Sequence, residues 1–155
     1  GAVNGAAVAG GLELLLCCDI IIAAEGAKIG DGHARYGIVP AGGATVRLLE
    51  RLSPSHAAQL FYTASLLDAA TLRDWGLVNE VVPGDRLMPR AMEMARQIAE
   101  RSPEVVRHVK ALTGLHAADR ALRLRNEIER FGHHVHGADL AKGLAAFHHK
   151  QPPRY

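Results

Sequence analysis

The amino-acid sequence predicts an α/β fold, with short strands interleaved with helices in the first half and helices alone in the second. The first half is rich in glycine and contains short β-branched runs such as residues 19–24. From Leu87 on, apolar residues recur at helical spacing almost to the end of the chain. The 155 residues, 48% of them apolar, suffice for the core of one ordinary domain.

Local signals place the elements along the chain. The expected elements are a strand running into a turn at residues 1–5, a buried helix at 10–18, a central strand at 19–24, a short strand at 27–30, a helix entered through Thr45, helices at 53–64 and 68–76, and a strand at 77–83. Ser53 followed by proline is typical of a helix N-terminus, and Asp68 and Gly76 are expected to cap and to end the next helix.

A long helix is expected near the C-terminus. Its apolar residues are spaced by 3, 4, 3 and 4 positions and form one stripe: Ala121, Leu124, Ile128, Phe131 and Val135.

Composition excludes several classes of function. A net charge of +2 is too small to indicate a nucleic-acid partner, and the longest apolar run, residues 14–18, is too short to cross a membrane. Cys17 and Cys18 are expected to be small buried apolar residues in a reducing compartment. The histidines near the C-terminus lack the spacing of a zinc site, so no metal is expected.

Gly10, Gly11 and Glu13 form the first candidate site. The two glycines directly precede an apolar helix, whose first N–H groups have no intrahelical acceptor. Glycine lets a ligand approach the backbone closely, which suits a developing oxyanion. Glu13 lies three residues further on in an otherwise apolar run, where a carboxylate is either functional or a first-turn acid that complements the helix dipole.

Four segments together carry a family resemblance. They are, in order, AVNGAAVAGGLELLLCCDIIIAAEGAKIG, GIVPAGGATVRL, DAATLRDWGLVNEVVP and GLAAFHHKQPPRY. With them the chain closely resembles the crotonase superfamily, in its enoyl-CoA hydratase/isomerase family, and matches the larger, C-terminal part of a family chain. The resemblance implies a ClpP/crotonase-like ββα spiral, incomplete at the N-terminus. Residues 1–85 would form this core with its active-site loops, and residues 86–155 a helical region for trimerisation and for covering coenzyme A.

The resemblance also implies chemistry on an acyl-CoA thioester, as in fatty acid metabolism, with no cofactor beyond the coenzyme A of the substrate. The thioester oxygen would lie between two backbone N–H groups and become an enolate-like oxyanion. Gly10 matches the second of these donors, with Gly11 beside it, and Glu13 matches the first catalytic glutamate. The implied assembly is a homotrimer or hexamer, in the cytoplasm or, in a eukaryote, in the mitochondrial matrix.

His33 stands where the hydratases of this family have a second glutamate. It is expected to exchange a proton, to orient water or substrate, or to replace the glutamate without a catalytic role; all three remain open. Asp31 is two residues away, and on an extended segment such residues share a side. Asp31 is therefore expected either to hold His33 as a cation or only to cap the turn.

Three further residues correspond to substrate-binding positions in the family. Pro40 begins a turn that would shape the wall of the acyl pocket. Phe147 would pack near the adenine, and Lys150 would pair with the phosphates of coenzyme A or remain a solvated lysine of the tail.

These residues leave the reaction itself open. Because His33 departs from the hydratase pattern, isomerisation, dehydration and thioester hydrolysis all remain alternatives. In the family, one oxyanion donor and the early strands lie upstream of the matched region. The chain is therefore also considered as an inactive fragment or a structural subunit of a trimer.

Overall fold

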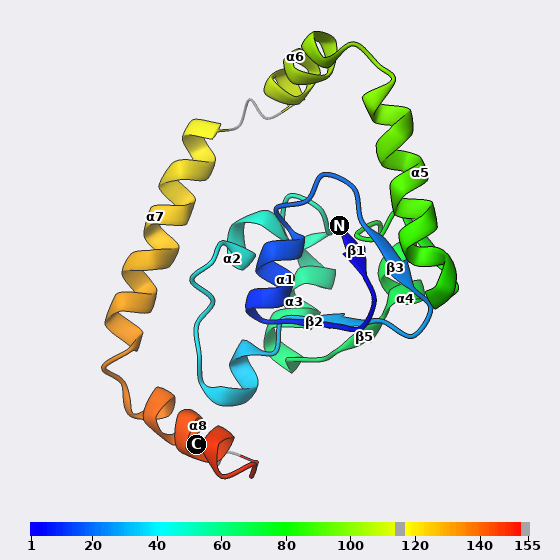
Figure 1. Cartoon of the computed structure of the whole chain (residues 1–155). Coiled ribbons are helices and arrows are strands. Elements are labelled where there is room, and N and C mark those ends of the chain that lie inside the picture. The colour runs from blue at the N-terminus through cyan, green and yellow to red at the C-terminus, as the bar shows by residue number, and fades with distance from the viewer. Residues whose placement is uncertain (114–116, 153–155) are drawn as a thin grey trace.

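The computed structural model describes residues 1–113 and 117–152 (Figure 1). The strands are β1 (Ala2–Val3), β2 (Ala6–Val8), β3 (Ile22–Ala24), β4 (Lys28–Gly30), β5 (Leu67–Asp68) and β6 (Glu80–Val82). The helices are α1 (Gly10–Leu15), α2 (Ala44–Arg47), α3 (Pro54–Thr63), α4 (Ala69–Asp74), α5 (Leu87–Ala99), α6 (Pro103–Thr113), α7 (Ala117–His134) and α8 (Ala138–His148), with the short 3-10 helices η1 (His33–Tyr36) and η2 (Gly84–Arg86). The predicted α/β class is confirmed.

The strands form two small sheets. In the first, β3 lies between β1 and β6 and is parallel to both, with Ala23 opposite Val3 and Val81. This confirms the prediction of a central strand. In the second, β4 pairs in parallel with β2 and antiparallel with β5. β2 is not among the predicted strands, because Ala-Ala-Val has little intrinsic strand preference and becomes a strand through its pairing with β4.

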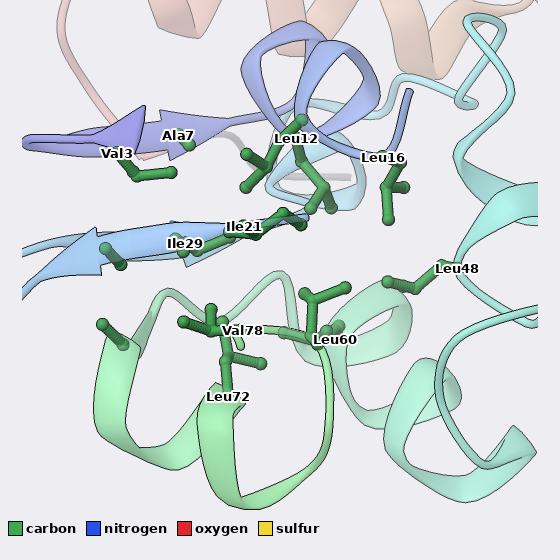
Figure 2. Packing of buried hydrophobic residues seen from close by; sticks show 14 of the residues in the cluster. Val3, Ala7, Leu12, Leu16, Ile21, Ile29, Leu48, Leu60, Leu72 and Val78 are labelled. Carbon is green, nitrogen blue, oxygen red and sulfur yellow. The ribbon is translucent and has the colours of Figure 1, made fainter. Parts of the chain in front are cut away.

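The main core lies where α1, the sheets, α3 and α4 meet. Figure 2 shows Leu12 of α1 on one side of Ile21 and Ile29, with Leu60 of α3 and Leu72 of α4 on the other. All five side chains are fully buried. Burial of each stabilises the fold by about 1.5–3 kcal/mol, so this core holds α1 firmly against the strands.

The predicted helix boundaries in the middle of the chain are confirmed with one difference. Ser53 Oγ accepts a hydrogen bond from His56 N at 3.3 Å, as an N-cap should. Gly76 follows α4 with a φ of +90°, which favours glycine. Asp68 stands at the N-cap of α4, but its carboxylate bonds Lys28 instead of the helix N–H groups.

The prediction that both cysteines are buried is wrong. Cys17 is exposed, Cys18 is half-buried, and both are free thiols. They follow α1, whose outer face is in solvent, as the 75% exposure of Leu14 shows. Only one face of the apolar segment that contains them packs against the core.

The helices from α5 to α8 run around the outside of this core (Figure 1). α7 returns to contact α2, and α8 packs against η1. The predicted apolar stripe lies largely on α7 and is covered only in part: Leu124 and Phe131 are half-buried, whereas Ile128 is 60% exposed. Among the described residues, no helix has the length and apolar character needed to span a bilayer.

The close packing of α8 on η1 can be tested by substitution of a glycine at the contact. A Cβ added to Gly143 in α8 would overlap the carbonyl oxygen of Tyr36 in η1. Gly143→Ala should therefore destabilise the protein by about 1–3 kcal/mol, because backbone cannot yield as a side chain can. Urea unfolding followed by circular dichroism measures this loss.

Gly132→Ala is the matched control. Gly132 also lies inside a helix, and a Cβ added there meets no atom within 4 Å. Alanine should raise the free energy of unfolding by up to about 1 kcal/mol through helix propensity. Equal stability of the two variants would contradict the close contact between α8 and η1.

Candidate active site

Asp31 and His33 form a buried pair at the end of β4. Asp31 Oδ1 lies 2.9 Å from His33 Nδ1, and Asp31 Oδ2 accepts a hydrogen bond from His33 N at 3.2 Å. The two residues are 1% and 9% exposed. Contact with His33 was one of the two roles expected for Asp31, but the extended conformation on which that role was based is wrong. Gly32 has a φ of +71° and turns the chain into η1, so Asp31 both caps the turn and holds the ring.

The charges around His33 favour its protonated form. Burial, the largest influence, acts to lower the pKa of His33, while the hydrogen bond and charge of Asp31 act to raise it. The negative charges of Glu13 and Glu127 act in the same direction as Asp31, and together these groups outweigh burial, so the pKa of His33 is raised above 6.5. The pair therefore stabilises the fold fully below about pH 6.5, and this contribution is lost as pH rises through the folded-state pKa.

Glu13 lies on α1 and reaches across to the loop that precedes α2. Its Oε1 accepts a hydrogen bond from Gly42 N at 2.7 Å. A Cβ at position 42 would overlap the Glu13 carboxylate, so glycine is required for this close approach. The carbonyl oxygen of Gly42 in turn accepts a hydrogen bond from Arg47 Nη1 at 2.8 Å.

Glu127 of α7 is a residue that the sequence prediction missed. Its side chain is buried beside the same loop, where Oε1 accepts a hydrogen bond from Gly43 N at 2.5 Å. Its Oε2 accepts from Thr45 N at 2.9 Å and from the Thr45 hydroxyl. One signal was available: Glu127 lies three residues after Leu124 and four before Phe131, on the apolar stripe itself.

Gly10 and Gly11 begin α1, as predicted. A Cβ added to Gly10 would meet no atom within 4 Å, so the space beside this backbone is open. The preceding residue, Ala9, has a φ of 52°, which shows how sharply the chain turns from β2 into the helix. The first N–H groups of the helix have no intrahelical acceptor and can donate to a ligand.

A cavity of about 420 Å³ adjoins the Asp31–His33 pair. It is lined mainly by apolar side chains, and Pro40 forms part of its wall. The lining residues are Asp31, Ala34, Ile38, Pro40, Thr45, Leu49, Pro54, Ala58, Phe61 and Tyr62.

A second cavity, of about 890 Å³, lies between η1 and the end of α8. Phe147 and Lys150 both line it, and the Phe147 ring meets Tyr36 edge to face at 5.2 Å. The structure thus brings these two C-terminal residues to η1, which also carries His33. Ala34 lines both cavities.

Comparison with known proteins gives a consistent result. The family model for enoyl-CoA hydratase/isomerase matches residues 1–155. The methylglutaconyl-CoA hydratase of Mus musculus is 35% identical over 99% of this chain and 51% of its own length. The crotonyl-CoA hydratase of Syntrophomonas wolfei is 38% identical over 99% of this chain and 60% of its own.

A solved structure extends the similarity to the fold. The enoyl-CoA hydratase/isomerase of Pseudoalteromonas atlantica superimposes with a TM-score of 0.92 at 28% identity, over 99% of this chain and 62% of that one. This supports the crotonase-like fold expected from the sequence. The chain spans about half the length of the curated relatives it matches. With the family model matching from the first residue to the last, the chain belongs to the enoyl-CoA hydratase/isomerase family.

Proposed function

We propose that the protein catalyses reversible hydration and dehydration at C2 and C3 of an acyl-CoA thioester, through an enolate. The observation that carries this proposal is the buried Asp31–His33 pair, in which the charge of Glu13 acts to raise the pKa of the His33 imidazole. Addition or removal of water across a double bond needs two groups that exchange protons. A carboxylate and an imidazole with a raised pKa supply two such groups.

In the dehydration direction, Glu13 takes the proton from C2 and the thioester oxygen gains negative charge. The N–H of Gly10 donates to that oxyanion. The C3–O bond then breaks as the imidazolium of His33 gives its proton to the departing hydroxyl, which leaves as water. Asp31 orients the imidazole and stabilises its charged form. Hydration is the reverse of these steps.

The two cavities that Ala34 lines support a mode of substrate binding. The acyl group would occupy the smaller, mainly apolar cavity beside Pro40. Coenzyme A would lie across Gly11 and in the larger cavity, with Phe147 against the adenine and Lys150 near the phosphates. Names of the relatives, crotonyl-CoA and methylglutaconyl-CoA hydratase, agree with an enoyl-CoA substrate.

A non-catalytic subunit of a larger assembly is the second candidate. The observation that favours it is that the chain spans about half of the relatives it matches. In the family, one of the two oxyanion donors lies upstream of the matched region, and loss of one such donor lowers the rate by about 100- to 1,000-fold. A set of short-chain and branched enoyl-CoA and 3-hydroxyacyl-CoA thioesters, offered to the 155-residue chain with product identification, separates the two candidates.

Glu13→Gln is expected to lower kcat by well over about tenfold on the thioester that is turned over, because the amide cannot accept the C2 proton. Glu25→Gln is the matched control, since Glu25 is exposed on a turn after β3 and should keep full activity. Steady-state kinetics of both variants provide the measurement. Full activity of Glu13→Gln would remove this residue from the mechanism.

The pH dependence tests His33. In the dehydration direction, kcat should fall as pH rises through the raised pKa of His33, because the imidazolium is the acid. Asp31→Asn removes the charge that raises this pKa, so the falling limb should move to lower pH. His33→Gln should abolish the limb. A pH–rate profile that is the same in all three proteins would limit His33 to orienting the substrate.

We also propose that the chain forms a homotrimer or a hexamer. Support comes from the large apolar side chains exposed along the helices from α5 to α8, including Met92, Val105 and Leu122. Sedimentation equilibrium of the 16.6 kDa chain should give the mass of three or six copies. A monomer at micromolar concentration would contradict this assembly.

A further inference from the structure

We infer that Glu127 is a positioning residue, which fixes the loop before α2 so that Gly42 N–H points at the carboxylate of Glu13. For its effect on catalysis this inference rests on the proposed function. Its structural part concerns only the hydrogen bonds of Glu127, Gly42 and Glu13 and can be tested without any activity.

The burial of Glu127 is exceptional for its helix. The next residue, Ile128, is 60% exposed, whereas Glu127 is 5% exposed. A carboxylate removed from water destabilises the fold unless it is hydrogen-bonded. Here Gly43 N, Thr45 N and the Thr45 hydroxyl all donate to it. Gly43 is the last residue of the loop, and Thr45 lies in the first turn of α2, so the donors span the junction of loop and helix 82 to 84 residues earlier in the chain.

The peptide group that joins Gly42 to Gly43 is held on both sides. Its carbonyl oxygen accepts from Arg47, and its N–H donates to Glu127. A peptide group is planar, so these two bonds fix its orientation. Only the φ and ψ of Gly42 then separate this fixed plane from the N–H that holds Glu13.

Two adjacent glycines make such anchoring necessary. Glycine has wide conformational freedom, and Gly43 adopts a φ of +101°, which side-chain-bearing residues rarely do. Without Glu127, the plane between Gly42 and Gly43 would keep, among the described residues, only the hydrogen bond from Arg47. Gly42 N–H would then sample other directions, and the carboxylate of Glu13 would lose its fixed partner.

Amide hydrogen exchange by NMR tests the structural part with Glu127→Gln. The carboxamide keeps one acceptor oxygen, but its NH2 group cannot accept from a backbone N–H. We expect exchange at Gly42 to become faster by about tenfold, together with Gly43 or Thr45, because hydrogen bonds to a charged group are lost. Faster exchange at Gly43 or Thr45 with unchanged exchange at Gly42 would overturn the inference.

Glu129→Gln is the matched control, because Glu129 is exposed on the same helix and the change in charge is the same. In Glu129→Gln, the amide exchange rates of Gly42, Gly43 and Thr45 should equal those of the wild type. If Glu127→Gln does not fold, Thr45→Val takes its place, since it removes only the hydroxyl donor. The amide hydrogen of Gly42 should then exchange about two- to fivefold faster. This effect is smaller than that of Glu127→Gln, because the charged acceptor stays in place and only one donor is removed. An unchanged exchange rate at Gly42 overturns the inference.

A double-mutant cycle tests the catalytic part. Glu127→Gln alone should lower kcat by about tenfold with KM within about twofold, because it disturbs a catalytic group and not substrate binding. In the Glu13→Gln background, the same change should have almost no further effect on kcat at a pH where His33 is protonated in every variant, so that the charge of Glu127 no longer acts through the pKa of His33. An equal loss in both backgrounds would show that Glu127 does not act through Glu13. Absence of turnover in the wild type would refute the proposed function, while the exchange rates would still decide the inference.

Discussion

The backbone N–H groups of the loop before α2 are divided between two carboxylates that come from opposite ends of the chain. Gly42 donates to Glu13 on α1, and Gly43 donates to Glu127 on α7. A loop that contains two glycines has little preference of its own for one shape, so its conformation follows from these partners. The loop thereby joins the first helix of the core to a helix that is otherwise largely exposed, and it shapes one side of the site.

The site is also constrained by the free-energy cost of burying the ionisable imidazole of His33. Burial alone would keep His33 neutral, yet its pKa is raised. Asp31 provides the largest compensation, because it bonds both the ring and the backbone of His33. The more distant charges of Glu13 and Glu127 act in the same direction. The site thus concentrates negative charge around one imidazole, an arrangement typical of groups that transfer protons.

Much of the fold could be predicted because its signals are local. The glycines at the start of α1, the capping Ser53 and the isoleucines at 20–22 that lead into β3 each act within a few residues. The position of Glu13 in an apolar run likewise marked it as unusual.

Features that depend on distant contacts could not be predicted in this way. β2 needs its partner strand, and the exposure of Cys17 depends on which face of α1 the core covers. The partners of Glu127 are more than 80 residues away, so its sequence neighbourhood shows only a polar residue on an apolar stripe. The sequence offers the contact between Asp31 and His33 as one of two roles for Asp31, but it does not show the left-handed turn at Gly32 that brings the two together.

Ala34 is an exposed residue of η1 that lines both the cavity beside Asp31 and the cavity beside Phe147. A molecule long enough to occupy both cavities would therefore contact residue 34 between its two ends. One position in η1 is in this way common to the recognition of both ends of such a molecule.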